Sequence, residues 1–160
     1  MDALIEQIVE VTPLGASPAA GVYSHVTNDR SREFGLMDAI YATRGGLLTG
    51  DEVLAMLRTR APSPVSAVAR PIARREVVSF TWRGQLLMPA FQFDPHAISH
   101  RAAVTRVVVE MRDVFDDWEI ALWFASRNSW LGGQRPVDAL DQREAAVISA
   151  ARADRYIRIG

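Results

Sequence analysis

The chain has 160 residues, of which 49% are hydrophobic and 23% are charged, and its formal net charge is -1. This length suits one domain, or one domain with a small module, and the charge excludes a protein that coats polyanions with its whole surface. Cysteine is absent, which excludes disulfide scaffolds, thiolate zinc sites and cysteine nucleophiles. All 18 basic residues are arginine, so chemistry that depends on lysine is excluded as well.

The sequence also predicts where the protein resides. No apolar run approaches the ~18 residues of a membrane span. The first residues carry acid and lack the basic start of a signal peptide. We therefore expect a cytoplasmic protein with no membrane partner.

Residues 1–45 are expected to form an N-terminal helical segment. Apolar residues recur at helical spacing over residues 4–9, and the stretch 13–31, rich in Pro, Gly, Ala, Ser and Asn, predicts a mobile connection. A second helix is predicted over residues 31–44. Two glycines that can adopt the left-handed conformation follow it and end it.

The next part of the chain predicts two helices joined by a turn. Thr49 and Glu52 fit a capping box that starts a helix running to about Arg58. Two prolines then force a turn. A second helix is predicted over residues 64–69, before Pro71 interrupts it.

A hairpin is predicted after these helices. Residues 76–82 and 85–93 are rich in β-branched and aromatic side chains, and they flank a tight turn at Arg83-Gly84. Helix, turn, helix and hairpin is the order of a winged helix-turn-helix. We assign this module to residues 46–95.

Residues 96–160 are expected to form a helical domain. Apolar residues over 104–115 make one amphipathic stripe, and a second helix starts after Asp116 and Asp117, either of which can cap it. The fold class predicted for the whole chain is mainly α, a helical bundle with a helix-turn-helix-like segment and one central β-hairpin.

The end of this domain is predicted to hold two more helices. Pro136 suits the first turn of a short helix. Asp141 with Glu144 is expected to cap a final helix that runs to about Arg152.

Charge is distributed unevenly, and the central module is basic. Residues 50–93 hold 6 arginines against 3 acidic residues, a net +3, whereas residues 1–49 carry -3 and residues 94–160 carry -1. A helix-turn-helix with a hairpin can bring such arginines to DNA, although an ordinary solvated arginine face gives the same pattern. Pro71 shortens the second helix, which weakens direct reading of a groove. The candidate DNA-binding residues are Ser63, Ser66, Arg70, Arg74, Arg75 and Arg83.

Candidate catalytic groups are few. His96 and His100 have the i, i+4 spacing of two metal ligands on a helix, but no third ligand is evident, and surface histidines explain them more simply. Asp116 and Asp117 lie in an acidic cluster that could work as acid and base, although helix capping explains them more simply. We expect no enzymatic activity, no metal site and no cofactor.

Three tryptophans, Trp118, Trp123 and Trp130, lie within thirteen residues. Five residues of helix turn through about 500°, or about 140° net, so Trp118 and Trp123 cannot both face one core. We expect one of them to be partly exposed and Trp130 to lie in a loop. Exposed tryptophan near arginine is typical of a protein interface, and packing of all three in the core is the alternative.

The stretch from Trp118 to Leu140 has a pattern of its own. Two tryptophans, five residues apart, lead to Asn128-Ser-Trp-Leu-Gly-Gly133-Gln-Arg-Pro136 and a leucine four residues later. This pattern resembles the toxin-binding domain of Xre/MbcA/ParS-type antitoxins, which has a tryptophan-bearing helix, an Asn-x-x-Leu-Gly-Gly-x-x-Pro-x-x-x-Leu loop and a short helix. The similarity covers roughly residues 46–155. It does not extend to the N-terminal third, which lacks an Xre-type repressor motif.

The resemblance implies an antitoxin of a type II system, which binds and neutralises a RES-domain toxin. Such a toxin degrades NAD and is encoded in the same operon. The resemblance also implies a homodimer or higher oligomer, which binds operator DNA to regulate its own operon. The alternative is a stand-alone winged-helix transcriptional regulator whose C-terminal helices dimerise or sense a ligand.

The resemblance further implies that the C-terminal end reaches the toxin's active-site cleft. Arginines and a tyrosine could plug a cleft built for an anionic dinucleotide, whereas a frayed terminus with solvated charges is the alternative. The candidate toxin-binding residues are Trp123, Asn128, Trp130, Arg152, Arg155, Tyr156, Arg158 and Gly160.

Overall fold

The computed structural model divides the chain into two compact units, Met1–Arg32 and Glu33–Gly160. The structure describes residues 18–58, 63–94 and 99–160, with side chains from residue 29 onward. The mainly helical fold with a hairpin is confirmed, whereas the three-part division drawn from the sequence stays a prediction. None of the described helices is both long and apolar enough to cross a membrane.

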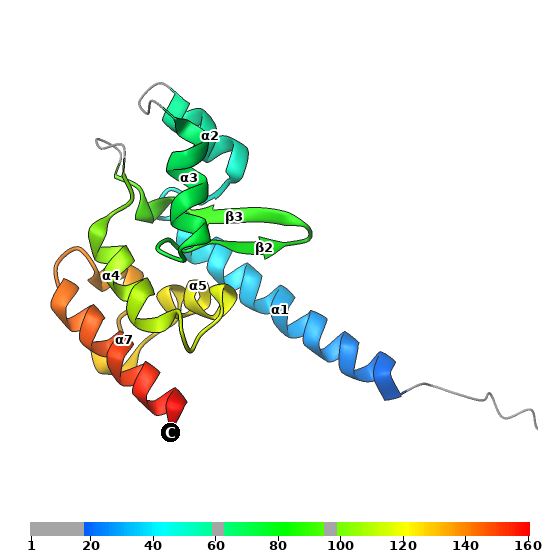
Figure 1. Cartoon of the computed structure of the whole chain (residues 1–160). Coiled ribbons are helices and arrows are strands. Elements are labelled where there is room, and N and C mark those ends of the chain that lie inside the picture. The colour runs from blue at the N-terminus through cyan, green and yellow to red at the C-terminus, as the bar shows by residue number, and fades with distance from the viewer. Residues whose placement is uncertain (1–17, 59–62, 95–98) are drawn as a thin grey trace, which may run out of the picture. The chain divides into compact units, whose positions relative to one another are not determined.

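The first described element is helix α1, Pro18–Ala42 (Figure 1). The described part of residues 13–31 is helical, so the prediction of a mobile connection there is wrong, while the helix predicted over residues 4–9 lies outside the described residues. A proline suits the first turn of a helix, where its missing N–H costs no hydrogen bond, and two alanines follow it. The predicted glycine stop is confirmed. Gly45 has a φ of 95°, and a Cβ there would lie 2.9 Å from Ala90 Cβ.

A winged helix-turn-helix arrangement follows α1 in the second unit. Its elements are β1 (Leu47–Thr49), α2 (Gly50–Arg58), α3 (Pro64–Ala73), β2 (Phe80–Trp82) and β3 (Gln85–Pro89). The strands form an antiparallel sheet in the order β1-β3-β2, and α2 packs against both α3 and the sheet (Figure 1). Strand β1 was not predicted, because three residues are too few to show an alternating pattern. The two hairpin strands are confirmed but shorter than predicted.

Helix α3 is longer than predicted. We expected Pro71 to end it near Ala69, but the helix continues to Ala73. Proline in a helix removes one backbone hydrogen bond and crowds the carbonyl four residues earlier. Because Pro71 lies only two residues before the helix end, the loss stays local, and Arg74 N–H still donates to the Arg70 carbonyl (3.1 Å).

The capping box predicted at the start of α2 is confirmed. Glu52 Oε2 accepts hydrogen bonds from the backbone N–H of Thr49 (2.7 Å) and from its hydroxyl (2.9 Å). Thr49 Oγ1 accepts in return from the N–H of Glu52 (3.2 Å). The bonds that Glu52 accepts lower the pKa of its carboxyl below the ordinary value of 4.5.

This capping box is expected to weaken at acid pH. A carboxylate whose pKa is lower in the folded state adds stability that is present above its unfolded pKa and is lost as pH falls through the folded pKa. The Glu52→Gln variant should therefore be less stable than the wild type at neutral pH, and the difference should close below pH 4.5. Urea unfolding between neutral pH and about pH 3 measures this. A difference that is the same at every pH would contradict the prediction.

The 3-10 helix η1 (Ala90–Gln92) follows the sheet. The described elements of the helical C-terminal part are α4 (Ala102–Met111), α5 (Asp117–Ala125), η2 (Ser129–Leu131), α6 (Pro136–Ala139) and α7 (Glu144–Ile159). Helices α4 and α7 pack side by side (Figure 1). Capping of α5 by one of the two predicted aspartates is confirmed for Asp116, whose carboxylate accepts from Glu119 N–H (2.7 Å). Pro136 begins α6, as predicted.

Two predictions about α7 are wrong. Asp141 does not cap this helix, because Arg143 precedes it without a side-chain cap, and Asp141 forms an ion pair with Arg101 instead. The helix also runs to Ile159 rather than to about Arg152. Its last two turns are held by carboxylates of α4 and α5, which sequence periodicity alone does not reveal.

The larger hydrophobic cluster joins the winged-helix elements to the C-terminal helices. It takes buried side chains from α1, the sheet and helices α4 to α7. Tyr41 is fully buried and donates its hydroxyl to the Ala121 carbonyl (2.5 Å), and burial raises the pKa of Tyr41 far above its ordinary value. Gln92 is also fully buried and bonds the N–H (2.7 Å) and the carbonyl (2.8 Å) of Val78. The sheet of the winged helix and the C-terminal part therefore share one core, whereas α2 and α3 pack around a second, smaller cluster that contains Val53, Leu57 and Met88.

Candidate functional site

Five of the six candidate DNA-binding residues are exposed on the winged helix. Ser63 and Ser66 lie at the start of α3, with 3.1 Å between their hydroxyls. Arg70 lies on α3, and Arg74 follows it with a long ion pair (4.0 Å) to the glutamate two residues on. Arg83 lies at the hairpin turn, where its guanidinium is 5.4 Å from the ring of the preceding tryptophan. These positions agree with a surface that could meet a phosphate backbone.

Arg75 differs, because its guanidinium is occupied within the molecule. Its Nε donates to Asp117 Oδ1 (2.7 Å), its Nη2 to the Phe115 carbonyl (2.8 Å), and its Nη1 to the Arg112 carbonyl. Arg112 donates in return to the Arg74 carbonyl (2.7 Å). These bonds fix the end of α3 against the segment between α4 and α5. We therefore assign Arg75 a structural role rather than a phosphate contact.

The exposed face of α3 carries small side chains around one arginine. Val65 is 65% exposed, and at helical spacing beyond it the exposed residues are Ser66, Ala69, Arg70 and Ala73. Small side chains let a helix come close to a surface, and a methyl group can contact a thymine methyl in the major groove. Sequence reasoning missed Val65 and the two alanines, because apolar residues of this size carry no charge signal.

Three of the eight candidate toxin-binding residues meet at a carboxylate that sequence reasoning missed. Asp154, on α7, accepts hydrogen bonds at Oδ2 from Trp123 Nε1 and from Asn128 Nδ2, both at 2.7 Å. Its Oδ1 accepts from Trp130 Nε1 (3.0 Å). Three donors from α5 and from the following turn therefore converge on one side chain of the last helix.

The turn that carries these donors is fixed by its own backbone. Asn128 caps η2, and its Oδ1 accepts from Trp130 N–H (2.9 Å). The Asn128 carbonyl accepts from Gly133 N–H (2.9 Å), and Asn128 N–H donates to the Gln134 carbonyl (3.0 Å). Gly132 has a φ of 68°, which favours glycine. An Asn at the start and glycines at the end are thus needed for the conformation of this turn.

The three tryptophans differ in exposure. Trp118 is buried and donates its Nε1–H to Glu33 Oε2 (2.7 Å), while Trp123 is half-buried and meets Phe124 edge to face at 5.2 Å. Trp130 is 56% exposed and lies in η2. The prediction that one of the first two is partly exposed is confirmed, and core packing of all three is excluded. The prediction of a loop at Trp130 is wrong, because this residue lies in the 3-10 helix η2.

The arginines of α7 are paired rather than free. Arg152 donates to Glu110 Oε1 through Nη2 (2.6 Å), and Arg155 reaches Glu110 Oε2 (3.3 Å). The hydrogen bond and the charge of Glu110 raise the pKa of Arg152. Arg158 donates to Glu119 Oε1 (2.7 Å). A frayed terminus, the alternative drawn from the sequence, is wrong, because these residues lie in a helix that ends next to Gly160.

Apolar side chains are the most exposed feature of the helix end. Tyr156 is 78% exposed, and Ile157 and Ile159 are exposed beside it. A hollow of about 290 Å³ lies next to them and is lined by Glu110, Arg152, Arg155, Tyr156 and Ile159. Because the arginines are paired, this end offers apolar surface with nearly balanced charge.

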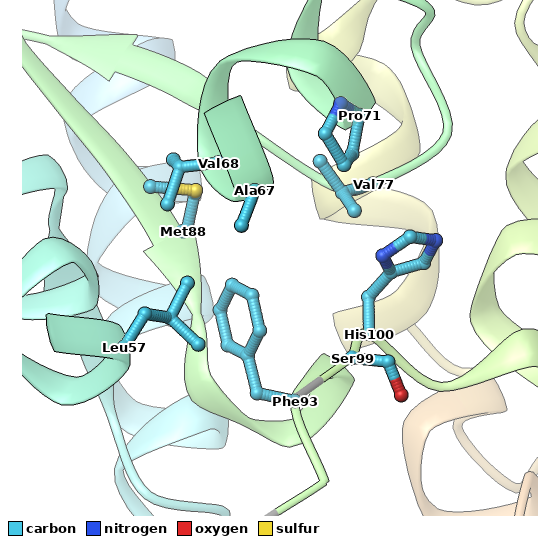
Figure 2. Close-up of a pocket in the computed structure, with 9 residues that line it drawn as sticks. All are labelled: Leu57, Ala67, Val68, Pro71, Val77, Met88, Phe93, Ser99 and His100. Atoms are coloured by element: carbon cyan, nitrogen blue, oxygen red, sulfur yellow. The ribbon is translucent and has the colours of Figure 1, made fainter. Parts of the chain in front are cut away.

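A small cavity lies beside α3 (Figure 2), lined by Leu57, Ala67, Val68, Pro71, Val77, Met88, Phe93, Ser99 and His100. Its free volume is about 20 Å³, which suits about one water molecule and no substrate. His100 lies at its edge, while His96, the other predicted metal ligand, lies outside the described residues. No cluster of three or more metal-ligating side chains occurs among the residues that the structure describes.

Sequence reasoning missed Asp154 because the final helix was predicted too short. Asp154 lies three residues after Ala151, which is fully buried, so a longer final helix would place the two on one face. A helix that ends near Arg152, as predicted, leaves this carboxylate out.

In comparisons with protein-family models, with curated proteins and with solved structures, the chain matches none.

Proposed function

We propose that this chain is an antitoxin that binds and neutralises a RES-domain toxin, an NAD-degrading enzyme encoded in the same operon. One observation carries the proposal: Trp123 and Asn128, which belong to the pattern that resembles the family, and Trp130, which lies within that pattern, all donate to Asp154 of α7. The motif is thus hydrogen-bonded to the C-terminal helix. A pattern that served only core packing would not need an exposed indole bonded to the last helix.

The chemistry of the motif and of the C-terminal helix supports a protein partner. Exposed large side chains lie in both parts, namely Trp130 in η2 and Tyr156, Ile157 and Ile159 at the end of α7. Aromatic residues of this kind dominate binding energy at protein interfaces. Because the three nearby arginines are all paired, two with Glu110 and one with Glu119, we propose that toxin contact is mainly apolar rather than a plug of free cations.

Co-expression tests the proposal directly. We expect the RES-domain toxin of the same operon to deplete NAD and arrest growth when expressed alone, and to do neither when this chain is present. An inactive toxin variant, expressed with and without the chain, controls for the load of expression. NAD depletion that persists with the chain present and folded would overturn the proposal.

A second candidate function is DNA binding by the winged helix, as a transcriptional regulator of its own operon or on its own. The strand order β1-β3-β2 and the exposed face of α3 favour it. A homodimer would present two copies of α3 to two half-sites. The two functions can coexist, since the DNA and toxin surfaces use different residues.

Replacing Arg70 and Arg74 together with alanine is expected to weaken binding to the operon's promoter DNA at every sequence tested. The slope of log affinity against log salt should fall by about 1 for each arginine that binds a phosphate in the wild type. Fluorescence anisotropy over a salt series measures both effects. Arg127→Ala, an exposed arginine of the C-terminal part, is the matched control. An unchanged affinity and slope in the double variant would contradict DNA contact through α3.

A further inference from the structure

We propose that Asp154 is a positioning residue, which holds the Trp130 indole outward as a preformed anchor. The anchor fits a pocket on a partner protein that is apolar inside and acidic at its rim. The identity of that partner as a RES-domain toxin rests on the proposed function. The role of Asp154 does not, because it can be measured in the chain alone.

Trp130 is held through its backbone and through its indole ring. Its backbone N–H donates to Asn128 Oδ1 (2.9 Å), and its indole Nε1–H donates to Asp154 Oδ1 (3.0 Å). More than half of the side chain is nevertheless exposed. An indole N–H at such a site can bond water at no cost. The hydrogen bond between Trp130 and Asp154, which we call the tether, is therefore not needed to satisfy the indole N–H. Its effect is to select one orientation of an exposed ring.

The tether also determines what a partner must offer. The indole N–H groups of Trp123 and Trp130 and the side-chain amide of Asn128 are all bonded to the Asp154 carboxylate. These donors are therefore already satisfied before a partner arrives. Ile157 follows Asp154 by three residues on α7, so it lies on the same face and extends the apolar surface. A pocket lined with carbon, without acceptors for the indole, matches this surface.

The positive charge of Arg127 beside Trp130 indicates what the rim of the partner's pocket has to carry. Arg127 is exposed on the turn that carries Trp130, and its guanidinium reaches only the Gly133 carbonyl, at 3.4 Å. Among the described residues, no carboxylate forms an ion pair with Arg127. An acidic group at the edge of the partner's pocket would complement this cation and speed encounter.

Holding the ring in place favours binding for an entropic reason. Association has to restrict side chains that are free in the unbound protein, and an anchor that is already fixed avoids part of that cost. Removal of the tether should therefore weaken binding even though the ring itself remains. Removal of the ring should weaken it more.

The first experiment uses the full chain without a partner. The indole Nε1–H signals of the four tryptophans are assigned by Trp→Phe variants, and hydrogen exchange is measured in the wild type and in Asp154→Asn. This substitution keeps the shape but replaces one acceptor oxygen with a donor. We expect exchange at Trp130 to speed up about tenfold or more, while Trp82 and Trp118 serve as controls for the fold. Unchanged exchange at Trp130 would overturn the positioning role.

The second experiment measures affinity for the RES-domain toxin. We expect the affinity of Trp130→Ala to fall about 100-fold or more and that of Asp154→Asn to fall about tenfold. The affinity of Trp130→Phe should stay within about tenfold of the wild-type value. Arg127→Glu should slow association at low salt. Leu86→Ala, a change at an exposed apolar residue of the hairpin, is the matched control and should bind as the wild type does.

The outcomes separate the two proposals. If the wild type does not bind the toxin, the proposed function fails and the docking surface fails with it, while the exchange result still decides the role of Asp154. If the wild type binds but Trp130→Ala binds equally well, the anchor is wrong and the antitoxin function stands. If the affinity of Trp130→Phe falls as much as that of Trp130→Ala, the partner needs the indole itself, and the proposal of a purely apolar pocket is wrong.

Discussion

Replacing Phe124 with alanine is expected to lower the free energy of unfolding by about 3–5 kcal/mol. Phe124 is fully buried on α5, and its ring lies 5.3 Å from that of Phe91 and 5.2 Å from that of Trp123. Truncation removes the transfer free energy of the ring and leaves a cavity between the winged helix and the C-terminal helices. Those neighbours are fixed by other contacts, so they cannot close over the gap.

Urea unfolding followed by circular dichroism measures this decrease. Tyr156→Ala is the matched control, because this aromatic residue is 78% exposed, and we expect it to change stability by less than about 0.5 kcal/mol. A decrease below about 1 kcal/mol at Phe124 would indicate that the two parts do not share a core.

Deleting Tyr156–Gly160 is expected to abolish neutralisation of the toxin while the fold is retained. The buried residues of α7 are Val147, Ala150 and Ala151, and all of them precede the deletion. The deletion removes the exposed apolar end of the helix and the pair between Arg158 and Glu119. Growth and NAD content during co-expression with the toxin measure the first effect, and thermal unfolding measures the second.

The deletion also removes Arg158. A triple variant with serine at Tyr156, Ile157 and Ile159 controls for this loss. It keeps the Arg158–Glu119 pair (2.7 Å) and removes only the exposed apolar side chains. We expect it to fail in neutralisation as the deletion does. Full protection by both variants would exclude the helix end from the interface and leave Trp130 as the part to test.

The fold was predictable where local chemistry decides it. The capping box at Thr49, the glycine stop at Gly45 and the N-cap at Asp116 each depend on a few neighbouring residues, and each is confirmed. Features that depend on distant partners were not predictable. Strand β1 exists because it pairs with β3, some forty residues away, and α3 continues past Pro71 into contacts at its end.

The candidate site shows the same division. Asn128 and Trp130 stand out in the sequence because the turn needs an Asn and two glycines at fixed spacing. Asp154 does not stand out, since its importance comes from three donors that the fold brings to it. The hydrogen bonds of Arg75 were not predictable for the related reason that their acceptors lie between α4 and α5, 37 or more residues away.

The core that Met37, Phe80 and Leu87 share with helices α4 to α7 limits how this protein can be recombined. Exchanging its winged helix for another at residue 95 would cut through packed side chains and leave both halves with open apolar faces. A functional chimera would need its junction at the boundary near Arg32. A junction elsewhere would require that the packed residues of the sheet and of helices α4 to α7 be redesigned together. The exposed face of α3 and the surface around Trp130 are thus inherited as one piece, and changes to either have to come from surface substitutions rather than from module exchange.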